Sequence, residues 1–333
     1  MVISFRFRLF HRQVGLSRKS RFAMAVASSS IYASDMVATD NIRGALFMTG
    51  AMTAFTVNDA FMKVLSDHLP FFQLLFIRSA AVTILIAAMA WRAGALRFEM
   101  SKRDKGLVAI RSMSEMGAAY FFLNALFNMP IADVTAILQA LPLTVALGAA
   151  LFLGEQVGWR RFLAIGIGFV GVMLIVRPTG DVFSVYSIYA LLAVACVTVR
   201  DLAARKLSAD VPSLTVALAA VVGVLAFASV GAAFTEWQPF EGRDYFLITG
   251  AIFAIIGGYL FSVMAMRVGD IGVVAPFRYS SLLAALILGL SVFGEWPDAV
   301  TQLGAAIVVA TGLYTLWRER KSARATPKAL RVR

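Results

Sequence analysis

The chain has 333 residues, of which 60% are hydrophobic and 15% are charged. Soluble globular domains average about 25% charged residues, so this composition excludes an ordinary soluble domain. The formal net charge of +12 at pH 7 suggests a nucleic-acid-binding protein, but the placement of the basic residues favours a membrane protein.

Residues 1–41 contain many basic residues and no apolar run long enough for a signal-peptide core, and we predict a disordered tail there. A bilayer span needs about 20 apolar residues. Ten segments meet this length, joined by short connections. They are residues 43–64, 70–91, 106–127, 132–153, 159–177, 183–204, 212–234, 245–266, 273–293 and 299–317. Residues 319–333 form a second basic tail. The predicted fold class is an all-α membrane protein with ten transmembrane helices.

Basic residues gather on one side of this predicted topology. They fill the N-terminal tail, the 92–105 connection and the C-terminal tail, whereas the opposite side has few. Cytoplasmic segments are enriched in Lys and Arg, so we expect both termini in the cytoplasm. The tails are then expected to contact lipid headgroups, with no nucleic-acid partner.

Histidine and cysteine are too scarce for a metal centre. Cys196 is the only cysteine, and His11 and His68 are the only histidines. No His/Cys cluster with ligand spacing can form from these residues, so we expect neither a metal nor another cofactor.

An internal repeat divides the chain into two halves, residues 42–178 and 183–318. Thr56-Val57-x-Asp59-x-x-x-Lys63-x-Leu65-Ser66 recurs as Thr198-Val199-x-Asp201-x-x-x-Arg205-x-Leu207-Ser208, and Gly154-Glu155 recurs as Gly294-Glu295. Each half has five predicted spans. Because five is odd, equivalent positions face opposite compartments, which predicts two inverted repeats.

Charged residues inside the predicted spans are the main candidates for a transport site. Intramembrane charges are costly and usually face a partner or an aqueous cavity. We expect Asp59 to pair with Arg78, and Arg111 with Glu115 one helical turn away. Adjacent side chains project in different directions, so Arg200 and Asp201 are expected to pair with different helices. These pairs either line a cavity or simply tie helices together.

Other candidates lie near prolines and aromatic residues. Pro276 and Pro142 predict breaks in two spans, beside Arg278-Tyr279 and Gln139 respectively. Tyr120 and Asn124 are one turn apart on the third span. Glu155 and Glu295 sit at span ends and are predicted to be caps or gates. The candidate binding or translocation residues are Asn58, Asp59, Arg78, Arg111, Glu115, Tyr120, Asn124, Gln139, Arg200, Asp201, Arg278 and Tyr279.

Two segments resemble the drug/metabolite transporter superfamily, specifically its ten-span group with two EamA-type domains. They are AILQALPLTVALGAALFLGE at 136–155 and VAPFRYSSLLAALILGLSVFGE at 274–295. The resemblance covers residues 43–318. Pro276 lies earlier in its span than the family pattern places this proline, which implies a different pocket there.

The resemblance implies a secondary transporter of a small metabolite in the bacterial cytoplasmic membrane. The fold does not select the solute. Riboflavin and S-adenosylmethionine rank first, followed by amino-acid-like or nucleobase-like metabolites. A metabolite or drug exporter of the same fold is the alternative. The chain is expected to act alone or as a homodimer. A non-transporting membrane enzyme is a weaker rival because the chain has no His-Glu-x-x-His motif, and ATP-driven transport is unsupported because it has no GxxxxGK[ST] loop.

Overall fold

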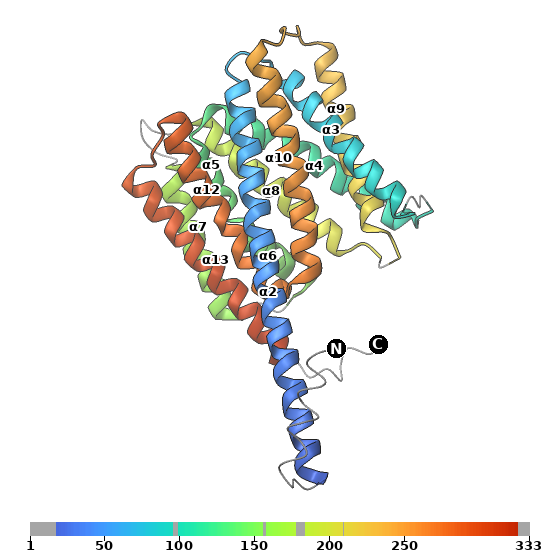
Figure 1. Ribbon diagram of the computed structural model, residues 1–333. Helices are drawn as coiled ribbons and strands as arrows, with labels where there is room; N and C mark the ends of the chain where they lie inside the picture. Colours follow the sequence, from blue (N-terminus) through green and yellow to red (C-terminus); the bar gives the residue numbers. More distant parts are fainter. Residues whose placement is uncertain (1–17, 96–98, 156–157, 178–183, 209, 326–333) are drawn as a thin grey trace.

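The computed structural model describes residues 18–95, 99–155, 158–177, 184–208 and 210–325. Throughout these ranges the regular elements are helices, and no strand occurs among them (Figure 1). An all-helical chain satisfies its backbone hydrogen bonds within each segment, as a lipid environment requires. The predicted all-α class is confirmed.

Six α-helices make up the described part of the first half. They are α2 (Arg18–Leu65), α3 (Phe71–Arg92), α4 (Lys102–Asn128), α5 (Ile131–Leu138), α6 (Leu141–Leu153) and α7 (Trp159–Val176). The second half contains α8 (Val185–Arg205), α9 (Ser213–Ala233), α10 (Gly242–Val268), α11 (Ile271–Val274), η1 (Ala275–Tyr279), α12 (Ser280–Leu288), η2 (Gly289–Phe293) and α13 (Ala299–Ala325).

Helices α2 and α13 extend into the two predicted tails. Helix α2 begins at Arg18, inside the 1–41 segment, and α13 continues to Ala325. No glycine or proline interrupts residues 18–43 or 319–325, so nothing in the local sequence stops either helix.

Within the described ranges, eight helical segments are long and apolar enough to cross a membrane. Consecutive α5 and α6 form one of them, and the run from η1 to η2 forms another. The predicted spans at 43–64 and 106–127 lie within α2 and α4, which carry more polar and charged residues. The count of ten spans therefore stays a prediction.

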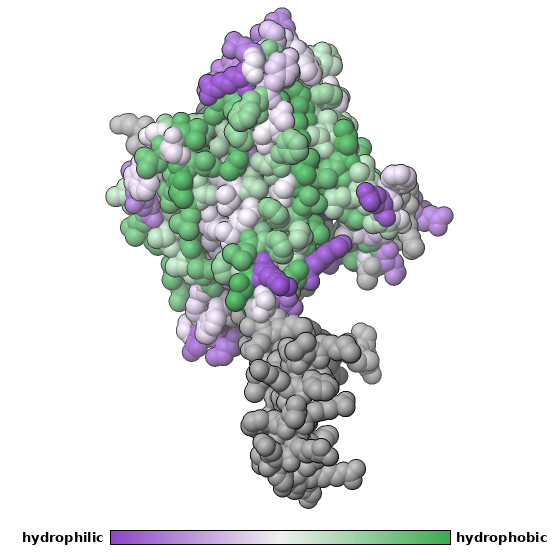
Figure 2. Space-filling model, viewed as in Figure 1, coloured by the Kyte–Doolittle hydropathy of each residue, from purple (hydrophilic) through white to green (hydrophobic). Residues whose placement is uncertain are grey.

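The outside of the helical bundle is apolar. Phe253, Phe246, Phe152 and Phe162 are between 59% and 73% exposed. Figure 2 shows apolar side chains over the broad middle of the visible face and polar side chains gathered at its two ends. An exterior of this kind fits a bilayer, in which exposed apolar surface has a lower free energy than in water.

Two helices break where prolines predict it. The α5–α6 break falls at Gln139 and Ala140, and Pro142 follows in the first turn of α6. In the second half, Pro276 lies at the start of the 3-10 helix η1. Proline lacks an N–H group and its ring clashes with the carbonyl four residues earlier, so a regular α-helix cannot run through either site.

The repeated Gly-Glu dipeptides end their helices in the same way. Gly154 and Gly294 cap α6 and η2 with φ angles of 71° and 65°. The following amides close the caps, since Glu155 N donates to Ala149 O at 3.2 Å and Glu295 N donates to Gly289 O at 2.8 Å. This left-handed conformation costs glycine little, and it places a glutamate just beyond each helix.

Helix packing joins the two halves. Helix α2 packs against α10 and α12, while α8 packs against α4 and α6. Helix α3 also packs against α9, and α7 packs against α13. Lys63 near the end of α2 defines one end of the bundle, called the Lys63 end. Arg205 at the end of α8 defines the other, the Arg205 end, on which side α2 begins and α13 ends (Figure 1).

Asp298 caps α13 outside the apolar segments. Its carboxylate accepts the N–H groups of Val300 and Thr301, both at 2.9 Å, and also contacts Arg177. The Thr301 amide and then the Arg177 guanidinium hold the pKa of Asp298 below its usual range. A lowered pKa means that this carboxylate stabilises the fold above its unfolded pKa of about 3.9, and less as the pH falls through its folded value.

Asp298→Ala is therefore expected to lower the free energy of unfolding by about 1 kcal/mol at neutral pH, the usual value of an N-cap. Unfolding of detergent-purified protein by dodecyl sulfate at pH 7 and near pH 3 measures this. The deficit should shrink in acid, and Asp298→Asn, which keeps an acceptor oxygen but loses the charge, should show part of it at pH 7. An equal deficit at both pH values would contradict an ionised cap.

Candidate functional site

A cavity of about 180 Å³ lies among six helices from both halves, α3, α4, α5, α8, α9 and α10. Most of its wall is apolar, and five lining residues are polar. The polar lining residues are Arg78, Ser79, Glu115, Arg200 and Tyr259, and the apolar ones are Val82, Ala118, Ala119, Phe122, Leu138, Ala193, Val197, Val221, Val224 and Ile255. An apolar pocket with a few convergent polar groups is the usual form of a small-molecule site.

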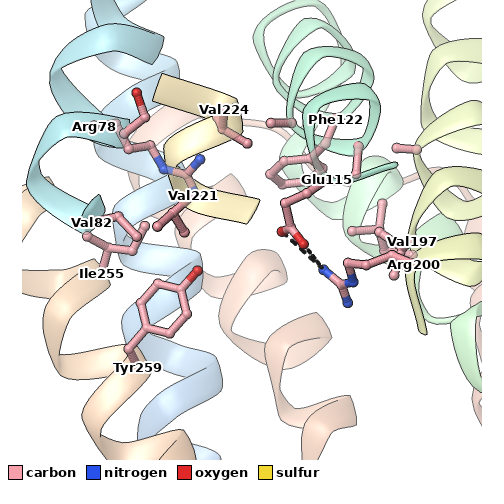
Figure 3. Close-up of a pocket in the computed structure, with 15 residues that line it drawn as sticks. Arg78, Val82, Glu115, Phe122, Val197, Arg200, Val221, Val224, Ile255 and Tyr259 are labelled. Atoms are coloured by element: carbon pink, nitrogen blue, oxygen red, sulfur yellow. Dashed lines mark hydrogen bonds and ion pairs between the residues drawn. The ribbon is translucent and has the colours of Figure 1, made fainter. Parts of the chain in front are cut away.

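Arg78 projects from α3 into the cavity, opposite Glu115 on α4 (Figure 3). Its Nε atom is buried and has no hydrogen-bond partner. The Tyr259 hydroxyl on α10 points into the same space (Figure 3). The wall formed by α3 and α10 therefore presents a guanidinium and a phenol.

Four charged residues form a network on the other wall. Arg200 Nη1 lies 3.3 Å and 3.5 Å from the two Glu115 carboxylate oxygens, and Arg200 Nε donates to Asp201 Oδ1 at 2.8 Å. Arg111 reaches Glu115 at 4.0 Å, so the predicted Arg111–Glu115 pair is confirmed. Arg200 reaches another helix as predicted, but Asp201 pairs with Arg200 on its own helix, so the prediction of separate helices is wrong for Asp201. The long guanidinium side chain folds back onto its neighbour and still reaches α4.

Asp59 does not form the predicted ion pair with Arg78. Its Oδ1 atom instead accepts a hydrogen bond from Asn58 Nδ2 at 2.9 Å. The Arg78 charge acts on Asp59, but the two side chains form no direct ion pair. Both Asn58 and Asp59 lie on α2, which contributes nothing to the cavity wall. Similar depth in the bundle did not bring the two side chains together.

Tyr120 and Asn124 lie outside the cavity lining. The Tyr120 ring packs edge-on against Phe71 and Phe121, with centroids 5.5 Å and 5.4 Å away. Asn124 Nδ2 donates to Tyr120 O at 2.8 Å on the same helix. Phe122 on α4 reaches the cavity instead.

The residues near the two breaks have different surroundings. Gln139 is buried, and its Nε2 donates to Ser281 Oγ of α12 at 2.7 Å. Arg278 is exposed, whereas Tyr279 is buried with an unpartnered hydroxyl. A Cβ atom on Gly312 would lie 1.8 Å from that hydroxyl, so this glycine admits the Tyr279 ring.

The two repeated glutamates each pair with a basic residue of the other half. At the Lys63 end, Glu295 Oε1 lies 2.8 Å from Lys63 Nζ, and Glu295 Oε2 accepts the Ile131 N–H at 3.1 Å. Lys63 Nζ also donates to Met129 O at 2.5 Å. At the Arg205 end, Glu155 Oε1 lies 3.1 Å from Arg205 Nη1.

These two ion pairs differ in exposure. The Lys63 and Glu295 side chains are 11% and 27% exposed, whereas those of Arg205 and Glu155 are 43% and 44% exposed. The Lys63 end therefore carries the more buried pair, and the Arg205 end carries the more exposed one.

Sequence reasoning did not select Tyr259, Lys63 or Arg205 as site residues. Tyr259 follows Gly257-Gly258 in the middle of an apolar helix, and a phenol at that depth was a usable signal. Lys63 and Arg205 occupy matching places in the internal repeat, as Glu155 and Glu295 do. Because both the basic residues and the glutamates recur in the repeat, the sequence could have predicted two equivalent ion pairs. Among the described residues, no three His, Cys, Asp or Glu side chains are grouped to hold a metal.

Known transporters resemble this chain over most of its length. The model of the EamA-like transporter family matches the chain twice, at residues 42–177 and 185–317. The pseudopaline exporter of Pseudomonas aeruginosa is 28% identical, with 80% of this chain and 93% of that protein covered. The S-adenosylmethionine uptake transporter of Rickettsia prowazekii is 23% identical, at coverages of 84% and 95%. The riboflavin transporter of Vibrio cholerae is 27% identical, at 85% and 96%.

A solved crystal structure matches with a TM-score of 0.56 at 18% sequence identity, covering 86% of this chain and 98% of the other. At that identity the match supports the fold alone. The family matches cover most of the chain, and the apolar helices make it a multi-pass membrane protein. This chain belongs to the EamA-like transporter family.

Proposed function

We propose that this protein is a secondary transporter that moves a small organic metabolite across the bacterial cytoplasmic membrane by alternating access. The observation that carries the proposal is the cavity between the halves, with Arg78 and Glu115 from the first and Arg200 and Tyr259 from the second. A site built from both halves opens to one side or the other when the halves rock against each other.

The proposal includes ten spans arranged as two inverted five-helix repeats. Two family matches of similar length support the duplication. The packing supports the inversion, because α2 on α10 and α12 is matched by α8 on α4 and α6. The Gln139–Ser281 hydrogen bond joins corresponding spans of the two halves, as expected near a two-fold axis.

Both termini are proposed to lie in the cytoplasm, so the Arg205 end faces inward and the Lys63 end outward. The basic tails and the basic 92–105 connection support this orientation. Glu155 with Arg205 and Glu295 with Lys63 then act as inner and outer gates. The tighter outer pair corresponds to a state closed toward the outside.

The candidate solutes follow from the relatives and from the cavity. Relatives named for S-adenosylmethionine and riboflavin uptake support these two solutes, and an exporter relative supports the outward direction as an alternative. The apolar wall suits an organic ring or chain, and the charged residues suit a zwitterion. Glu115 and Asp59 are the candidate proton carriers if proton exchange drives transport.

Solute counterflow in liposomes tests this proposal. Purified protein should exchange external labelled S-adenosylmethionine or riboflavin for an internal unlabelled pool. Liposomes that contain an unrelated membrane protein should show no exchange. Absence of exchange for both solutes and for a wider metabolite panel would contradict transport. Exchange that ignores an imposed pH gradient would remove the proton role and leave transport standing.

A further inference from the structure

One cation of the cavity wall, Arg78, forms no direct ion pair with a described carboxylate, although its charge acts on Asp59 of α2. Arg200 is balanced by Glu115 and Asp201, and Arg111 lies within 4.0 Å of Glu115. Arg78 forms no ion pair among the described residues, and its buried Nε lacks any hydrogen-bond partner. A buried donor without a partner destabilises a fold, more so when it is charged. The buried Arg78 Nε therefore lowers the stability of the fold, and helix packing does not explain why it is there.

The geometry opposes a purely structural role for this residue. A helix-tying arginine would form a direct ion pair with a carboxylate of another helix, yet Asp59 is hydrogen-bonded to Asn58 and Arg78 acts on it only through its charge. The Arg78 guanidinium instead faces the cavity, opposite Glu115 (Figure 3). An incoming anion would supply the missing partner.

We propose that Arg78 is the anion-binding subsite of the transport cavity and that the solute carries a carboxylate. This inference rests on the proposed transport function. The planar guanidinium fork binds a carboxylate through two parallel hydrogen bonds. The solute body would then rest on Val82, Val221 and Val224, with a cationic or hydrogen-bond-donating group toward Glu115.

Charge matching favours a single carboxylate over a phosphate. One unpaired guanidinium balances one negative charge. A dianionic phosphate would bring a second charge into a cavity whose opposite wall carries Glu115. The same reasoning separates the two leading solutes, because S-adenosylmethionine has a carboxylate and an amine whereas riboflavin has no carboxylate.

Binding of matched acids and amides tests the subsite. The full chain is purified in detergent, and thermal unfolding is titrated with S-adenosylmethionine and its decarboxylated form. L-methionine, L-phenylalanine and L-histidine are each compared with their amides. At least one acid should bind about tenfold more tightly than its neutral partner, the usual effect of a charge-assisted hydrogen bond. Arg78→Gln should bring that ratio to about one.

Arg92→Gln is the matched control, because Arg92 lies at the exposed end of the same helix. It should leave the acid preference intact. Without ligand, Arg78→Gln should unfold no earlier than the wild type, since it removes an unpaired charge. A variant that fails to fold would show a structural role and overturn the inference. So would a wild type with no acid preference, or a preference that survives Arg78→Gln.

Counterflow keeps this test separate from the transport proposal. An acid that binds through Arg78 but is not exchanged across liposomes contradicts transport and leaves the subsite intact. An acid and its amide exchanged at equal rates overturn the subsite and leave transport intact.

Discussion

Glu115→Gln is expected to slow solute exchange about tenfold or more while the protein still accumulates in the membrane. Glu115 is the carboxylate that both Arg111 and Arg200 approach at the cavity wall. Glutamine keeps the shape of the side chain and removes the charge. The loss of one charge-assisted interaction is worth roughly 1.5–3 kcal/mol, or about 10- to 100-fold.

Accumulation should survive this change because Arg200 keeps its 2.8 Å contact with Asp201. Counterflow rates are divided by the amount of folded protein, measured by size-exclusion chromatography. Glu99→Gln, in the exposed connection between α3 and α4, serves as the control and should behave as wild type. Equal loss of transport and of folded protein would instead assign Glu115 to helix packing.

The sequence predicted the local features of the fold well. Apolar segment length predicted most of the helices, and Pro142 and Pro276 predicted both breaks because proline acts within its own helix. Gly154 and Gly294 predicted helix ends for the same local reason. The ten-span count stays a prediction because α2 and α4 carry polar residues that weaken the apolar signal.

Contacts between helices were harder to predict. Depth along the bilayer suggested an Asp59–Arg78 pair, but depth does not fix the rotation of each helix about its axis. Asp59 therefore bonds to Asn58, while Arg78 faces the cavity. The Arg111–Glu115 pair was predictable because a one-turn spacing within a single helix fixes both height and direction. Tyr259 was missed because its role depends on where α10 lies relative to α3.

Glu295→Gln is expected to open the Lys63 end, whereas Glu155→Gln should change the Arg205 end little. Lys63 bonds to Glu295 and to the Met129 carbonyl, and it lies 4.9 Å from the Phe293 ring centroid. Breaking a buried pair costs about 3–5 kcal/mol, and partial exposure favours the lower value. Exposed pairs are worth about 0.2–1 kcal/mol.

If breaking the Lys63–Glu295 pair destabilises only the state closed at the Lys63 end, a loss of about 3 kcal/mol raises the open-to-closed ratio about 100-fold. A single reporter cysteine measures this shift. Ala118→Cys in the cavity wall is combined with Cys196→Ser, and a membrane-impermeant maleimide is added from the Lys63 side. Labelling should speed up strongly for Glu295→Gln and only slightly for the repeat-related control Glu155→Gln.

A charge exchange between Lys63 and Glu295 should not restore slow labelling. Each side chain also bonds a backbone group of fixed polarity, the Met129 carbonyl for Lys63 and the Ile131 amide for Glu295. Exchange would set a carboxylate against the carbonyl and an ammonium against the amide, so only the mutual attraction would survive. Equal labelling of Glu295→Gln, Glu155→Gln and the parent protein would mean that these pairs cap helices without gating the cavity.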